Sequence, residues 1–218
     1  AATPAPLWSR GLGDVYKRQV LGHSKGGGMM NQLAEVLPHR VRAVINLDGI
    51  PNKRGFNTQI DRSDTQALEA ELSGWLDHRR RAGQASRRAD SIDGLAERRQ
   101  LMNPRLSMDW LRYLVTVGAK QDPDGWRWKI DPTLRFGPSG AWRPEWAIPR
   151  LRGLRVPYLG VIGTVKEEMG WGTTPEEAFP ILPDGAEFHA LADTGHFVHI
   201  ERPGDIAALV ADFLRRVL

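Results

Sequence analysis

A glycine-rich stretch that contains one serine constrains the fold of this chain more than any other feature. It reads Val20-Leu21-Gly22-His23-Ser24-Lys25-Gly26-Gly27-Gly28, which is typical of a strand end, a tight turn and the start of a helix. The pattern G-x-S-x-G carries the serine hydroxyl on a sharp turn, where side chains at the flanking positions would collide with the neighbouring backbone. We therefore expect Gly22 and Gly26 to relieve that crowding.

The residues after this turn continue the pattern of an α/β protein. Pro38 would stop a helix that begins at the turn, and residues 41–47 form a β-branched apolar run that suits a buried parallel strand. The helix itself is indicated by apolar residues at helical spacing, namely Met29, Met30, Leu33, Ala34 and Leu37. The order strand, turn, helix and strand predicts an α/β fold with a mostly parallel sheet and flanking helices.

The start of the predicted helix is suited to stabilising negative charge. Its unpaired N–H groups and the positive end of the helix dipole would face the serine. We expect Lys25 to donate its backbone N–H to an oxyanion that forms when Ser24 attacks a substrate. His23, on the other side of the serine, is a second candidate for contact with the substrate.

The segment 22–49 reads GHSKGGGMMNQLAEVLPHRVRAVINLDG. It resembles the nucleophile elbow, the following helix and the next strand of the α/β-hydrolase superfamily. The resemblance implies a partial α/β-hydrolase fold in which Ser24 is the nucleophile. A serine at this position argues against the dehalogenases and epoxide hydrolases of the same fold, because their reactions need a carboxylate nucleophile.

A second segment, residues 194–203, reads TGHFVHIERP and resembles the histidine loop of the same superfamily. Residues 187–191 read as the last strand before this loop. The resemblance implies that His196 is the general base and later the general acid, while Gly195 lets the loop bring the ring over Ser24. We interpret His199 as structural.

The carboxylate that would orient His196 has more than one candidate. In the superfamily the commonest acid follows the strand that we expect at residues 156–163, but Lys166 stands at that position and Glu167 and Glu168 come just after it. Asp48, at the end of the strand 41–47, lies where open parallel sheets gather functional groups. We favour Asp48, since it requires no slippage of the later loop, and leave both glutamates open.

The resemblance also implies how the chain divides. Residues 20–50 and 151–218 would form the hydrolase core, and residues 51–150 would form a helical cap inserted between its strands. Helices are indicated in this insertion at residues 65–81, 92–102 and 108–117. Its large aromatic residues would either line an apolar pocket or form the core of the cap: Trp126, Trp128, Phe136, Trp142 and Trp146.

Residues 1–19 do not read as the start of a domain. The first seven residues are rich in alanine and proline, and residues 9–19 are polar and look like translated adapter DNA. We therefore expect residues 1–19 to be non-native or disordered. Because the superfamily places the serine after its fifth strand, the resemblance implies a truncated chain that lacks the earlier strands and the second oxyanion donor.

The composition narrows the classes of partner. The sequence has no cysteines, and 30 Lys and Arg residues nearly balance 26 Asp and Glu residues, for a formal net charge of +4. This mixed surface, without aromatic-interleaved basic motifs, argues against a nucleic-acid binder. The sequence shows no signal peptide or membrane-spanning run. We expect a cytoplasmic protein that acts on a small molecule without a metal or organic cofactor; the oligomeric state stays open.

The resemblance implies a serine hydrolase that cleaves an ester-like bond of a small or medium apolar substrate through a Ser24-His196-Asp48 triad and an acyl-enzyme. Amides, lactones and carbon–carbon bonded diketones stay open as substrates. The alternative is a non-catalytic protein of the hydrolase fold that binds a ligand, and the departure at Lys166 keeps this alternative open.

Overall fold

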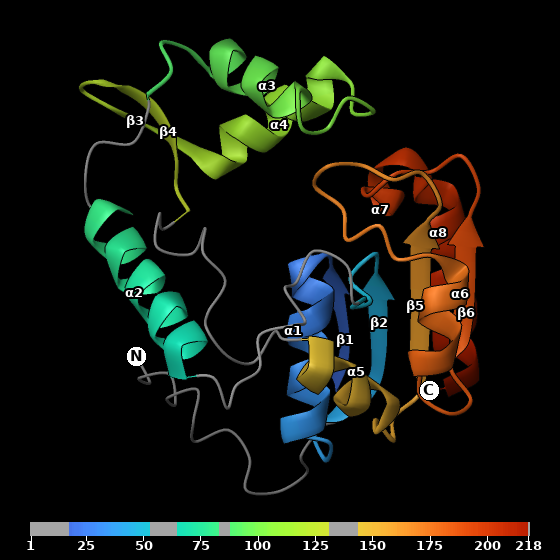
Figure 1. Cartoon of the computed structure of the whole chain (residues 1–218). Helices are drawn as coiled ribbons and strands as arrows, with labels where there is room; N and C mark the ends of the chain where they lie inside the picture. The colour runs from blue at the N-terminus through green and yellow to red at the C-terminus, as the bar shows by residue number, and fades with distance from the viewer. Residues whose placement is uncertain (1–17, 53–64, 83–87, 131–143, 218) are drawn as a thin grey trace, which may run out of the picture.

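The computed structural model describes residues 18–52, 65–82, 88–130 and 144–217. Its centre is a four-stranded sheet in which every neighbouring pair of strands is parallel and the strand order is β1-β2-β5-β6. The four arrows point the same way in Figure 1. The strands are β1 (Arg18–His23), β2 (Val41–Leu47), β5 (Tyr158–Gly163) and β6 (Glu187–Leu191). The predicted α/β fold with a mostly parallel sheet is confirmed.

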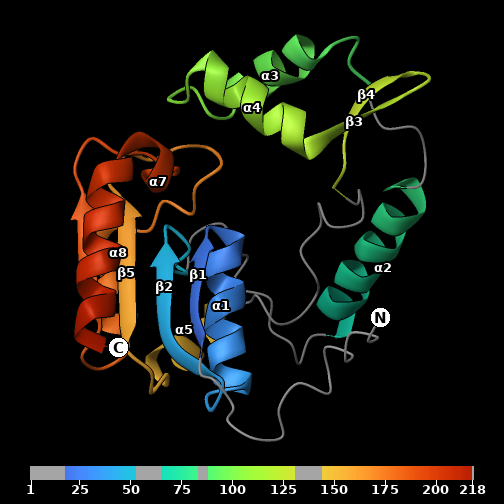
Figure 2. The ribbon, with the colours of Figure 1, turned by 180° about the vertical axis from the view of Figure 1, so that it is seen from behind.

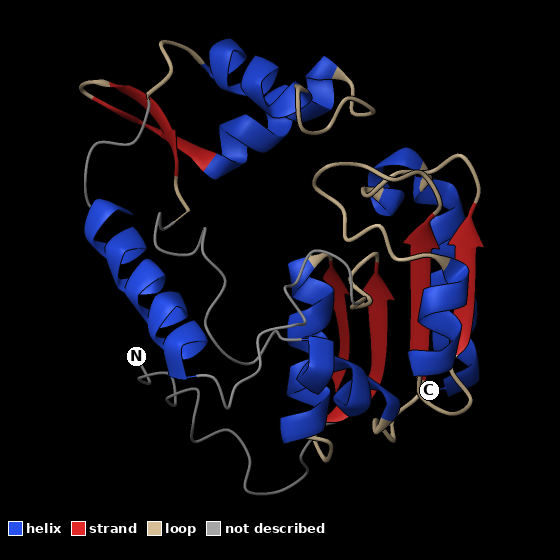
Figure 3. Ribbon diagram, in the orientation of Figure 1, coloured by secondary structure: helices blue, strands red, loops and turns tan. Residues whose placement is uncertain are grey.

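Helices cover both faces of this sheet. On one face lie α1 (Lys25–Val36) and α5 (Pro144–Arg152), and on the other lies α8 (Pro203–Val217), as Figure 3 shows with strands in red and helices in blue. Alternate residues of β2 point to opposite faces of the sheet. Val44 belongs to the core cluster beneath α1, and Ile45 belongs to the cluster beneath α8. A strand buried on both faces explains why residues 41–47 read as a continuous apolar run.

Helix α1 packs on the sheet through its small residues. Its buried positions are Gly27, Gly28, Asn31 and Ala34. Two of the larger apolar residues at helical spacing are exposed: Met29 is 51% exposed and Leu33 is 36% exposed. Small side chains let the helix axis approach the sheet closely, which turns the methionine and leucine side chains away from it.

Two short helices and a 3₁₀ turn flank the C-terminal half of the sheet. They are α6 (Pro175–Ala178), the turn η3 (Phe179–Ile181) and α7 (Val198–Glu201). A capping box starts α6, since Thr174 accepts from the N–H of Glu177 and the Glu177 carboxylate accepts from the N–H of Thr174. Helix α7 begins two residues after His196, and α8 begins two residues after the end of α7.

The insertion between β2 and β5 contains both helices and a hairpin. Its elements are α2 (Thr65–Ala82), α3 (Ile92–Gln100), α4 (Met108–Gly118), β3 (Ala119–Asp122) and β4 (Gly125–Trp128). Figure 2 shows α3, α4 and the hairpin gathered into one lobe, seen from behind. We expected helices here and did not expect the antiparallel hairpin, whose tight turn uses Gly125 at φ +119°.

Trp126 and Trp128 pack against the apolar core of this lobe, so for these two residues the structure favours a place in the core of the insertion over the lining of a pocket. Trp142 and Phe136 lie outside the described residues. The same cluster includes Phe197, the residue after His196, so the lobe contacts the sheet domain next to His196.

The predicted domain boundaries fall inside regular elements. Strand β1 begins at Arg18, inside the segment 1–19, and α5 spans the boundary predicted at residue 150. Residues 1–17 lie outside the described residues. Among the helices that the structure describes, none combines the length and the apolar character needed to cross a bilayer.

Candidate active site

Ser24 lies on the turn between β1 and α1 in a strained backbone conformation. Its φ is 55° and its ψ is −126°, a region that costs a residue with a side chain of order 1–3 kcal/mol. The backbone holds it there: the Ser24 N–H donates to Leu47 O at 2.9 Å, and Gly27 N–H donates to Ser24 O at 2.9 Å. The side chain makes no capping bond to α1, so the hydroxyl is not used by the helix end.

The two glycines of the G-x-S-x-G pattern differ in what surrounds them. A Cβ at Gly22 would meet the carbonyl group of Gly26 at 2.3 Å, whereas a Cβ at Gly26 would meet nothing within 4 Å outside its own helix. The expectation that both glycines relieve crowding is therefore correct for Gly22 and wrong for Gly26. Gly26 is already part of α1, with open space where its Cβ would be, whereas Gly22 faces the backbone of Gly26.

Asp48 and His196 meet at the carboxyl ends of the strands. Oδ2 of Asp48 accepts a hydrogen bond from Nδ1 of His196 at 2.6 Å, and the two residues are 9% and 3% exposed. Oδ1 of Asp48 accepts from the N–H of Gly163 at 3.1 Å. A carboxylate that accepts at Nδ1 fixes the neutral ring as the Nδ1–H tautomer, with the Nε2 lone pair available.

The other acidic candidates take different positions. Glu167 is 7% exposed, and its Oε2 accepts from the backbone N–H of His196 at 2.6 Å. Its other oxygen, Oε1, is buried without a hydrogen-bond partner among the described residues. Glu168 and Lys166 are exposed. Of the three acids left open by the sequence, the structure brings Asp48 to the imidazole ring and places Glu167 on the backbone behind it.

His23 supports the histidine loop from the opposite side. Its Nε2–H donates to the carbonyl oxygen of His196 at 2.8 Å, and its ring centroid lies 4.6 Å from those of His196 and His199. Burial, with smaller contributions from the neighbouring imidazoles of His196 and His199, lowers the pKa of His23 to about 4. Burial also lowers the pKa of His199. His23 is therefore a neutral hydrogen-bond donor at pH 7; its predicted contact with substrate stays a prediction.

Lys25 is the first residue of α1, and its side chain is exposed. Within the described residues, its backbone N–H has no backbone acceptor, as expected at the first position of a helix. After Lys25, the N–H groups of Gly27 and Gly28 both donate to the Ser24 carbonyl. The Lys25 N–H is thus available to an anion at the serine.

One residue that the sequence analysis passed over organises the turn around Asp48. Asn46 is fully buried, its Oδ1 accepts from the N–H of Gly49 at 2.8 Å, and its Nδ2 donates to Gly49 O at 3.2 Å. These bonds close the backbone around Asp48, which has φ 50°. The available signal was an asparagine inside an apolar strand run, because a buried amide needs partners.

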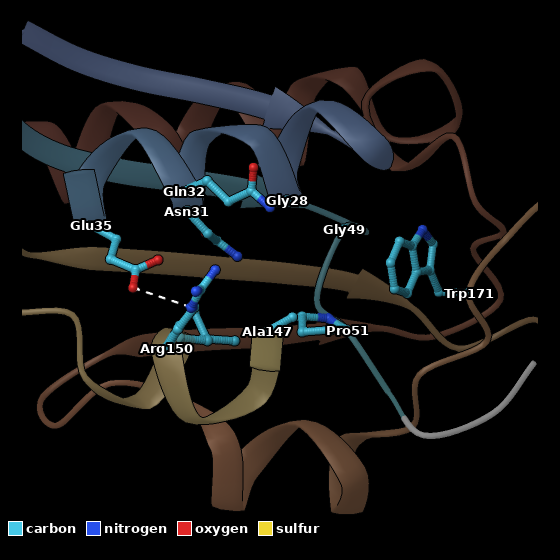
Figure 4. Close-up of a pocket in the computed structure, with 10 residues that line it drawn as sticks. Gly28, Asn31, Gln32, Glu35, Gly49, Pro51, Ala147, Arg150 and Trp171 are labelled. Carbon is cyan, nitrogen blue, oxygen red and sulfur yellow. Dashed lines mark ion pairs between the residues drawn. The ribbon is translucent and has the colours of Figure 1, made fainter. Parts of the chain in front are cut away.

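Two cavities lie near these residues. One, of about 460 Å³, is lined by both Asp48 and His196 and by Glu167. The other, of about 400 Å³, lies between α1, α5 and Trp171, and Figure 4 shows the Glu35 carboxylate facing Arg150 at one end of it. No cluster of three or more histidine and acidic side chains among the described residues is arranged to hold a metal ion.

A parallel sheet with helices on both faces, a serine on a strand-to-helix turn and an Asp-His pair at the strand ends are the architecture of an α/β hydrolase. The profile of the alpha/beta hydrolase family matches residues 5–209. The chain belongs to this family.

Solved structures share this fold at low sequence identity. A hypothetical protein from Pseudomonas aeruginosa PAO1 aligns with a TM-score of 0.70 at 20% identity, over 91% of this chain and 68% of its own. The thioesterase domain from the curacin biosynthetic pathway gives 0.65 at 19%, over 91% and 66%. An esterase of Mycobacterium tuberculosis gives 0.66 at 20%, over 90% and 62%.

The chain thus spans about two thirds of the length of these structures. A comparison with curated protein sequences finds no significant match.

Proposed function

We propose that this protein is a serine hydrolase that cleaves an ester-like bond of a small or medium apolar substrate through an acyl-enzyme. The observation that carries the proposal is the buried 2.6 Å hydrogen bond between Asp48 and His196, formed in a chain whose serine sits on a strained strand-to-helix turn. A serine hydroxyl is a weak nucleophile by itself, and a histidine held by a carboxylate is the usual means of activating it.

In this proposal His196 moves the proton. Asp48 holds the ring with Nδ1 protonated, so Nε2 accepts the proton of Ser24 as Oγ attacks the substrate carbonyl. The carboxylate then stabilises the imidazolium that forms, because it is close to the ring and shielded from water. The same Nε2–H next protonates the leaving alcohol, and the acyl group stays on Ser24.

The Lys25 N–H is one donor to the oxyanion of the tetrahedral intermediate. It lies at the N-terminus of α1, where the helix dipole adds to the hydrogen bond. Hydrolysis of the acyl-enzyme repeats the cycle with water in place of the alcohol: His196 takes a proton from water, which attacks the acyl carbon, and Ser24 leaves with that proton.

The insertion between β2 and β5 is the proposed cap, residues 51–150. Its lobe packs on Phe197 beside the histidine loop, which is the position from which a cap excludes water and shapes a substrate pocket. The names of two similar structures, a thioesterase domain and an esterase, are consistent with acyl transfer to water. We propose carboxylic esters as the substrate class on this basis.

A fluorophosphonate probe tests the proposal directly, because it labels serines that are activated by a general base. Intact-mass measurement of the folded protein should show one added probe, and the Ser24→Ala variant should show none. Turnover of p-nitrophenyl esters of increasing acyl length then gives the preferred substrate size. A folded wild-type protein that neither takes up the probe nor turns over esters would contradict the proposal and favour a ligand-binding protein of the same fold.

A further inference from the structure

The histidine loop is held by side chains at successive peptide groups. The Glu201 carboxylate accepts from the N–H of Gly195 with both oxygens, at 3.0 and 3.1 Å. Glu167 accepts from the next N–H, that of His196, at 2.6 Å. Charge-assisted hydrogen bonds of this kind are about twice as strong as neutral ones. The position of the His196 backbone therefore depends on where these two carboxylates are held.

Glu201 is in turn held by an arginine from the cap. Arg105 lies between α3 and α4, and its Nε donates to Oε2 of Glu201 at 2.7 Å. Its Nη2 donates to the backbone carbonyl of Asp193 at 2.5 Å. One guanidinium therefore joins both ends of the loop 193–196, through the Asp193 carbonyl and through the carboxylate that binds Gly195.

The packing around these bonds leaves little freedom. A Cβ at Gly195 would meet Oε2 of Glu167 at 2.3 Å, and Cδ of Arg105 and Oε1 of Glu201 at 2.8 Å. The side chain of Glu201 is 11% exposed and that of Arg105 is 35% exposed, so the pair is partly shielded from solvent. Leu106, next to Arg105, and Phe197, next to His196, belong to one buried apolar cluster.

We propose that Arg105 is a positioning residue for His196, supplied by the cap and acting through Glu201 and the Asp193 carbonyl. The inference rests on the proposed function and extends it: the cap sets the rate of the chemical step as well as the shape of the substrate site. A displacement of about 1 Å in a catalytic group can cost about 100-fold in rate. Loss of the guanidinium should therefore lower kcat rather than weaken substrate binding.

Arg105→Met keeps the length of the side chain and removes the guanidinium. We expect kcat to fall about 10- to 100-fold while KM changes less than about threefold, since the affected group acts in the transition state. The kcat of Arg105→Lys should lie between those of the wild type and Arg105→Met. An ammonium reaches Glu201 or the Asp193 carbonyl but lacks the planar fork that holds both. A rise in KM at unchanged kcat would overturn the inference and assign Arg105 to substrate binding.

Arg112→Met is the matched control. Arg112 lies on α4 of the same cap, and its partners Asp93 and Asp109 belong to the cap as well. The substitution removes the same charge without touching the histidine loop, so kcat should stay within about twofold of the wild type. An equal loss of kcat in the Arg105 and Arg112 variants would refute the positioning role.

Two further measurements separate positioning from a general effect on folding. Methylguanidinium added to Arg105→Ala should restore at least about a tenth of the lost kcat, and methylammonium should restore less. A double-mutant cycle combines an Arg105 substitution with Glu201→Gln. The kcat of the double variant should be no lower than that of the slower single variant, because both substitutions act on the same bonds. Absence of rescue together with additive losses would overturn the inference.

Labelling of the wild-type protein with the probe separates a failure of this inference from a failure of the proposed function. If the wild type labels with the fluorophosphonate probe and Arg105→Met labels at the same rate, the proposed function holds and the positioning role fails. If the wild type does not label, the proposed function itself fails.

Discussion

The Glu167 carboxylate binds the backbone N–H of His196 at 2.6 Å, while the imidazole of the same residue is bound by Asp48, also at 2.6 Å. The two acids thus hold different parts of one histidine. Glu167 follows the strand end that commonly carries the acid in this family, but its carboxylate faces the peptide group of the loop rather than the ring.

Asp48→Asn should separate these two tasks. An amide at position 48 cannot stabilise the imidazolium and favours the wrong ring tautomer, so kcat should fall by about 10³- to 10⁴-fold. Glu167→Gln keeps an acceptor for the His196 N–H and should cost less than about 30-fold, and Glu168→Gln, on an exposed side chain, should have no measurable effect. Ester turnover at saturating substrate gives the ranking. A larger loss in Glu167→Gln than in Asp48→Asn would move the acid to the later loop.

Gly22→Ala should destabilise the protein by at least about 2 kcal/mol, since its Cβ would stand 2.3 Å from the backbone of Gly26 and neither strand nor helix can move away freely. Gly26→Ala is the matched control. It meets open space and replaces a helical glycine, so it should stabilise the protein by about 0.5–1 kcal/mol. Urea unfolding measures both free energies. Equal effects of the two substitutions would contradict the geometry of the turn.

The free energy of unfolding should decrease as the pH is lowered below the ordinary pKa of histidine, partly because of His23. Its pKa is 6.5 when unperturbed and about 4 in the fold, so between these values the unfolded chain binds the proton and the folded chain does not. The free energy of unfolding therefore loses up to about 1.4 kcal/mol per pH unit as the pH falls through this window, about 3 kcal/mol in all.

His23→Gln removes the titrating ring and leaves an amide that can still donate to His196. The difference in unfolding free energy between wild type and variant should shift in favour of the variant as the pH is lowered from 7 to 4. His39→Gln, at an exposed position, is the control. A difference that stays constant across this range would show that burial does not depress the pKa of His23.

Asn46→Ala should cost about 1–3 kcal/mol in stability, because the buried N–H of Gly49 loses its acceptor. It should also lower kcat, since the turn that carries Asp48 loses both bonds that close it. Gln121→Ala, an exposed amide on β3, should change stability by less than about 0.5 kcal/mol. Unfolding midpoints and ester turnover measured on the same preparations check both effects. An Asn46→Ala variant with wild-type stability would show that another group satisfies Gly49.

The local elements near the serine were predictable because their causes are local. Val41–Leu47 reads as a buried strand and is β2 with the predicted ends, since β-branched apolar runs fit a strand that is covered on both faces. Glu187–Leu191 is likewise a strand with the predicted ends. The serine turn follows from glycines within a few positions of it, although of the two glycines in G-x-S-x-G only Gly22 is needed for space.

Other local expectations failed where tertiary packing decided the outcome. The sequence does not predict the hairpin β3-β4, because its strands of four residues are too short to show alternation. Met29 and Leu33, two of the apolar residues whose spacing indicates the helix, are exposed. The buried positions of the helix are Gly27, Gly28, Asn31 and Ala34 instead, a choice that depends on the sheet beneath it.

The sequence by itself determined the serine turn, the order strand, turn, helix and strand around it, and the candidate histidine. Each of these features depends on residues that are near neighbours along the chain. Only the tertiary structure decided which carboxylate meets the imidazole, because Asp48 and His196 are 148 positions apart and Glu167 is 29 positions from the same histidine. It also brought Arg105 to Glu201 across 96 positions. Hydrogen bonds form within about 3 Å, and contacts of that precision depend on how the strands and the insertion between β2 and β5 pack, which spacing along the chain does not encode.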